Sequence, residues 1–80
     1  MAHLPKWDEM RLEHMHIGDE IILYGTLVRD GAGFALRVER GLLYHLQLHR
    51  VPVDHVEKRV RVAGTLIGER LIEAEGVAAA

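Results

Sequence analysis

The sequence predicts a mainly β domain in which five strands follow a short N-terminal helix. Three observations carry this prediction. Apolar residues alternate with polar ones from Glu20 onward, which is the period of a strand. Glycine-containing turns separate the alternating runs. A proline-containing segment, Val51 to Val56, interrupts the pattern after the third run, because proline lacks the N–H that a strand ladder needs.

Length and composition set the outer limits. The chain has 80 residues and no cysteine, so we expect one domain without disulfides or thiolate metal sites, which suits a reducing cytoplasm. It has no run of about 20 apolar residues that could span a bilayer. Its first residues lack the apolar core of a signal peptide. The predicted location is therefore the cytoplasm, with no membrane partner.

Residues 1–17 are predicted to be a helical segment. Pro5 suits a first helical turn, and Asp8 and Glu9 lie where the helix dipole favours acidic residues. Trp7 and Met10 fall on one apolar stripe at helical spacing, and Gly18 ends the helix.

The first strand runs from Ile21 to Val28. Both of its faces are apolar, so we expect it to be buried on two sides or to bend between two sheets, with the bend at Gly25. The turn Asp30-Gly31-Ala32-Gly33 then leads to a strand in which Phe34, Leu36 and Val38 form the apolar face.

The remaining strands follow the same logic. Arg40-Gly41 turns the chain into a third strand, residues 42–48, and the fourth and fifth strands lie on either side of a turn at Gly68-Glu69. Gly25-Thr26 and Gly64-Thr65 form a weak internal echo, which we interpret as two strands with the same bend. The predicted domain covers residues 18–77, and residues 78–80 form a tail.

Five strands with a break after the third and a glycine bend in the first resemble the OB-fold, a small Greek-key barrel. Closure into a barrel would also remove the exposed edges of a flat sheet. The segments RDGAGFAL (29–36) and RVPVDHVEKRVRVAG (50–64) are similar to an uncharacterised family of short bacterial OB-like domains. The resemblance implies a five-stranded OB-fold-like Greek-key barrel with a short N-terminal helix, but no functional residues, because OB-folds host many unrelated tasks.

The histidines do not predict a metal site. On an extended strand, His45 and His49 lie about 13 Å apart, whereas a metal ion needs ligand nitrogens about 2 Å from itself. His14 and His16, near the end of the predicted helix, are interpreted as solvated residues, because a helix C-terminus favours histidine. No metal and no cofactor are predicted.

Enzyme chemistry finds little support either. The chain contains no serine, cysteine or asparagine, so Thr26 and Thr65 are the hydroxyl candidates for a nucleophile, and packing explains both better. Glu73 and Glu75 share a strand face at about 7 Å, within the range of paired catalytic carboxylates, but a solvated strand face explains them better. We predict that the protein is not an enzyme.

The first functional hypothesis is a non-enzymatic binding or interaction module, whose partner is another protein or a second copy of the chain. Binding OB-folds hold their ligands across the second and third strands. On this sequence that candidate face consists of Arg37, Glu39, Leu43, His45, Gln47 and His49.

The alternative is weak binding of single-stranded nucleic acid through Arg37, Arg50, Arg59 and Arg61. Two observations disfavour it. The net charge is −2, whereas nucleic-acid binders usually carry a basic excess. The candidate face also has no aromatic residue for base stacking, because Phe34 and Tyr44 fall on the apolar side of the alternation.

Overall fold

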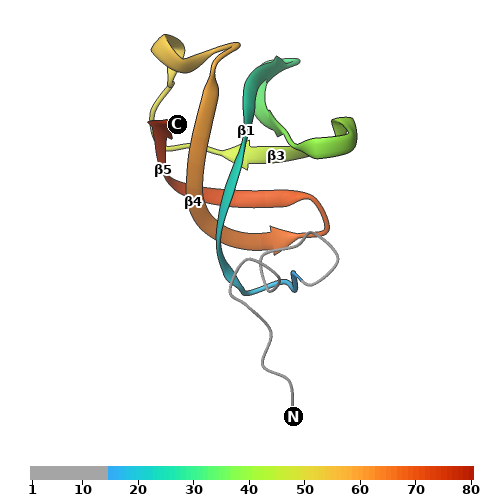
Figure 1. Cartoon of the computed structure of the whole chain (residues 1–80). Coiled ribbons are helices and arrows are strands. Elements are labelled where there is room, and N and C mark those ends of the chain that lie inside the picture. The colour runs from blue at the N-terminus through green and yellow to red at the C-terminus, as the bar shows by residue number, and fades with distance from the viewer. Residues whose placement is uncertain (1–14) are drawn as a thin grey trace.

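A computed structural model describes residues 15–80 of the chain (Figure 1). Two single 3-10 turns, η2 (Glu39–Gly41) and η3 (Val53–His55), interrupt the strands. The five strands are β1 (Glu20–Asp30), β2 (Gly33–Arg37), β3 (Leu43–Gln47), β4 (Arg59–Gly68) and β5 (Leu71–Ala79).

Every strand has a neighbour on each side. Hydrogen bonding joins them in the order β1, β2, β3, β5, β4, and β4 returns to β1, so the sheet closes on itself. Four of the five pairings are antiparallel. The exception is the parallel pairing of β3 with β5, which covers only His45 to Gln47 against Leu71 to Glu73.

The fold class predicted from the sequence needs correction. The prediction of an OB-fold-like Greek-key barrel with a short N-terminal helix is contradicted. What remains of it is a mainly β fold of five strands. Within residues 15–80 the helical segments are η2 and η3, each of three residues. The predicted helical segment, 1–17, lies outside the described residues except for its last three, which form no helix.

The number and order of the strands agree with the sequence prediction. The bounds differ for four strands. β1 is longer than predicted at both ends, and β2 ends at Arg37, before the predicted Val38. β3 is shorter than predicted at both ends, and β5 continues to Ala79, beyond the predicted end at Val77. None of the helical segments in residues 15–80 has the length and apolar composition required to cross a membrane.

The inward side chains form one apolar core. Leu27, Leu36, Val60, Val62 and Ile72 are completely buried, or nearly so, in its centre. Burying these side chains is the main source of stability in a domain of this size. The other buried members of the cluster are Ile21, Leu23, Phe34, Val38, Tyr44, Leu46, Leu66 and Ala74.

Strand β1 changes its partner at its centre. Residues Glu20 to Thr26 pair with β4, and residues Thr26 to Asp30 pair with β2. Gly25 lies at the change, where a Cβ atom would collide with the carbonyl oxygen of Arg37. Gly64 on β4 has the same constraint from the carbonyl oxygen of Glu73. Both glycines of the sequence echo are therefore required by close backbone approach.

The outer face of β1 departs from the sequence prediction. The sequence left two alternatives for β1, burial on two sides or a bend between two sheets at Gly25, but Ile22 is 41% exposed and Tyr24 is 52% exposed. Only Val28, in the second half, is buried on the outer side, at 7% exposure. The alternative of two-sided burial is therefore wrong for the half of β1 that pairs with β4, while the change of partner beside Gly25 agrees with the alternative of a bend.

Candidate functional site

The face predicted to bind a ligand lies on the outside of β2 and β3. Arg37 and Leu43 are directly opposed across the two strands, and His45 is opposed to Ala35. Arg37, His45 and Gln47 are exposed, as is Glu39 in η2, while Leu43 is half-buried. His49 follows the end of β3 and lines a groove instead. These residues therefore form a surface, with His49 set apart from the rest.

One side chain of this face is already engaged. His45 Nδ1 lies 2.8 Å from Asp30 Oδ2 of β1. Asp30 and His45 lie on either side of β2, and the outward residues of β2 between them are the small residues Gly33 and Ala35. Ala35 is completely buried. Because both members are more than a third exposed, water screens the pair and its contribution to stability is small. His45 thus has a structural role as a link between β1 and β3.

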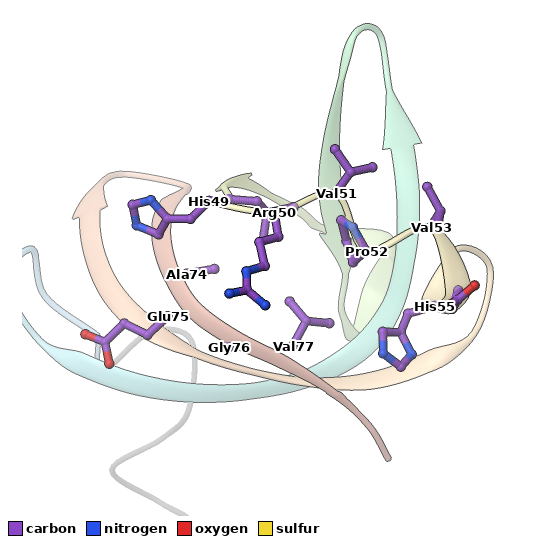
Figure 2. A pocket seen from close by; sticks show the side chains of 12 residues that line it. His49, Arg50, Val51, Pro52, Val53, His55, Ala74, Glu75, Gly76 and Val77 are labelled. Atoms are coloured by element: carbon purple, nitrogen blue, oxygen red, sulfur yellow. The ribbon is translucent and has the colours of Figure 1, made fainter.

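A groove of about 500 Å³ lies between β5 and the segment that connects β3 with β4 (Figure 2). The connecting segment supplies one wall, including Val51, Pro52 and Val53, and β5 supplies the other through residues 74–77. Arg50 extends its guanidinium into the groove above Gly76 (Figure 2). The volume is in the range of sites that hold small ligands or peptide side chains.

The four arginines of the nucleic-acid hypothesis divide into two groups. Arg50 lies in the groove. The other three lie on the outside of β2 and β4, on either side of β1, where Arg37 and Arg59 are both direct strand partners of Thr26. Adjacent strands are about 4.8 Å apart, so the Cα atoms of these two arginines lie about 10 Å apart on either side of Thr26.

Tyr24 completes this second group. Its direct partner on β4 is Arg61, so both side chains leave the sheet on the same side. Two residues further along β1, Thr26 continues the outer face with Arg59 beside it. We call Tyr24, Arg37, Arg59 and Arg61 the arginine–tyrosine surface. Within residues 15–80, none of its three arginines lies within 4 Å of a carboxylate.

The sequence interpretation missed Tyr24. Phe34 and Tyr44 are buried, as predicted, at 8% and 5% exposure, but Tyr24 was placed on a second apolar face of its strand and was not considered as a binding residue. A signal was present, because the facing residues on β4 are Arg59 and Arg61, and a strand opposite two arginines cannot be covered by an apolar layer. The pairing of the two strands had to be known before this signal could be used.

Among residues 15–80, no group of three or more histidine, aspartate or glutamate side chains is placed to hold a metal ion. His14 lies outside the described residues. Glu73 and Glu75 are exposed on β5, and Thr26 and Thr65 are half-buried within their strands.

The fold and these surfaces define a small mainly β domain with two separate places suited to a ligand, a basic aromatic surface and a groove. Residues 24–80 match the model of a family described as "Protein of unknown function (DUF5818)", and the chain belongs to that family. The expected resemblance to an uncharacterised family is confirmed to that extent. No curated protein and no solved structure matches the chain.

Proposed function

We propose that the protein is a non-enzymatic binding module that binds single-stranded nucleic acid weakly through the arginine–tyrosine surface. The observation that carries the proposal is the half-exposed ring of Tyr24 directly opposite Arg61. A base can stack on an exposed aromatic ring, while neighbouring guanidinium groups neutralise the phosphates on either side. Such a ligand would be met in the cytoplasm, where the sequence predicts the protein to be.

The composition of the outer surface supports this choice over a protein partner. Three guanidinium groups surround one aromatic ring and have no carboxylate within 4 Å among residues 15–80. They would be costly to bury against an apolar protein surface, because each would lose its hydration. A flexible polyanion satisfies them without full desolvation. The strand next to Arg61 contributes only Ala78 at this level, so no side chain blocks the approach from β5.

The magnitude of binding follows from the number of contacts. Three arginines that each neutralise one phosphate predict a slope of log K against log salt of about −2, since a single-stranded phosphate contributes about 0.7. One stacked base adds roughly 1–3 kcal/mol. The net charge of −2 opposes long-range attraction, so we expect weak binding that depends strongly on salt.

The test is fluorescence anisotropy of a labelled twelve-residue oligothymidine at low salt. Tyr24→Ala should weaken binding about tenfold, whereas Tyr24→Phe keeps the ring and should bind like the wild type. Arg61→Ala should weaken binding and reduce the salt slope by about 0.7. Arg50→Ala removes the same charge from the groove and serves as the matched control, with affinity expected to stay within about twofold.

Two results would overturn the proposal. The first is the absence of salt-dependent binding by the wild type at low salt. The second is equal weakening by Arg50→Ala and Arg61→Ala, which would mean that the oligonucleotide senses only net charge and not the arginine–tyrosine surface.

A further inference from the structure

Strand β5 has an edge that no other strand covers in the described part of the chain. Its pairing with β3 ends at Glu73, but β5 continues to Ala79 and from there on pairs only with β4. The segment that connects β3 with β4 forms no backbone hydrogen bond with this edge of β5 in the described residues. Its backbone hydrogen bonds run within the segment, as from His55 to Pro52, or to β1, as from Glu57 to Leu27.

The edge is shaped for close approach of another backbone. Of the four β5 residues that line the groove, Ala74 is buried in the core, but Gly76 is exposed, and a Cβ atom built on Gly76 would meet no atom within 4 Å. Natural proteins usually protect such an edge, because its unpaired N–H and C=O groups accept an added strand. Among residues 15–80, no strand pairs with this edge of β5 after Glu73.

The opposite wall supplies side-chain recognition. Val51 and Val53 are 65% and 56% exposed, which leaves two large apolar side chains without cover beside the groove. Arg50 points its guanidinium between this wall and β5 (Figure 2). Glu75 turns its carboxylate away from Arg50 (Figure 2), and no ion pair of Arg50 within 4 Å occurs among residues 15–80.

We propose that this groove is a docking site for an extended acidic peptide, which adds to the edge of β5 as a strand and places a carboxylate against Arg50. The main chain of the peptide pairs with the free edge, and its apolar side chains contact Val51 and Val53. Addition of a strand to an exposed edge is an established physical mode of peptide recognition, and the Arg–carboxylate pair gives it charge specificity. This site is separate from the arginine–tyrosine surface and does not depend on nucleic-acid binding.

The test is a titration of the ¹⁵N-labelled full chain with an acetylated, amidated heptapeptide of alternating valine and glutamate. Amide signals of residues 74–79 and 48–53 should shift. Arg50→Ala should weaken binding about tenfold, because a charge-assisted bidentate pair is lost. Arg61→Ala, the matched charge removal on the arginine–tyrosine surface, should leave the affinity within about twofold.

Two modified peptides separate the components of the site. Replacement of glutamate by lysine should abolish the shifts, and N-methylation of alternate amides along one edge should do the same, because it removes main-chain donors. Equal binding of either modified peptide would overturn the proposal. Concentration-dependent shifts of the same amides without peptide would also overturn it, since the occupant would then be a second copy of the chain.

Discussion

The two halves of β1 carry outer faces of opposite character. In the half beside β4, Ile22 and Tyr24 are exposed. In the half beside β2, Val28 is buried at 7% exposure, with Ala35 as its direct strand partner and the segment before β4 hydrogen-bonded to neighbouring Leu27. The half beside β4 is the richer in apolar residues, yet its outer face is the exposed one. In a closed sheet, therefore, the neighbouring strands and what reaches across them decide whether an outward apolar residue meets water.

The largest effect is expected at the glycine between the two halves. Gly25→Ala should destabilise the protein by roughly 3 kcal/mol or prevent folding, because the new methyl group meets the backbone carbonyl of Arg37 and backbone cannot move aside easily. Gly33→Ala is the matched control, since its nearest neighbour would be an ordinary contact at 3.9 Å. Urea unfolding followed by circular dichroism measures both. Equal stability of the two variants would show that β1 does not need the close approach.

Two neighbouring residues on opposite faces test the first half of β1. Leu23 is 6% exposed and Ile22 is 41% exposed. Leu23→Ala should cost about 2–4 kcal/mol, through lost burial and the cavity left behind. Ile22→Ala should cost less than about 1 kcal/mol, because much of that side chain is already in water. Comparable losses of unfolding free energy in urea would contradict the assignment of faces.

The inner face can be probed through pH. Burial raises the pKa of the Tyr44 hydroxyl above its ordinary value of 10.0, although the charge of Arg70 partly opposes the effect. The unfolded chain then loses this proton first as pH rises. The associated stability is fully present below pH 10 and is lost as the pH rises above it. Tyr44→Phe should therefore lose less stability than the wild type between pH 9 and pH 11, measured by urea unfolding. Identical pH slopes would place the hydroxyl in water.

The smallest effect is expected for the Asp30–His45 pair, beside the second half of β1. A double-mutant cycle with Asp30→Asn and His45→Gln should give a coupling energy of about 0.2–1 kcal/mol, as expected for exposed ion pairs. Thermal unfolding of the four proteins provides the values. A coupling energy of 3 kcal/mol or more would mean that the link between β1 and β3 is far less hydrated than its exposure indicates.

Much of the fold was accessible from the sequence because strand period and turn chemistry are local. The alternation around Phe34, Leu36 and Tyr44 predicted the inner face correctly, and Gly25 and Gly64 were identified as special positions. The length of β3 was not predicted, because Leu42 and Leu48 continue the alternation although the ladder has already ended.

The candidate sites were harder to predict, because they depend on pairing between distant segments. Tyr24 and Arg61 are 37 positions apart and become neighbours only through the register of β1 and β4. The groove exists because β5 continues to Ala79 after its pairing with β3 has ended at Glu73. No local sequence pattern predicts where this pairing ends. The predicted face on β2 and β3 stays a prediction, and the titrations described above report on His45 and Gln47 as well.

The parallel pairing of β3 and β5 is the weakest seam in the ring. It spans three residues of each strand. Because β3 and β5 are far apart in the sequence, the chain between them has to close into a long loop before they can pair. We expect this seam to form late in folding and to exchange its amide hydrogens sooner than the long ladder between β4 and β5. This pairing ends next to the groove, so its transient opening would widen the groove at that end.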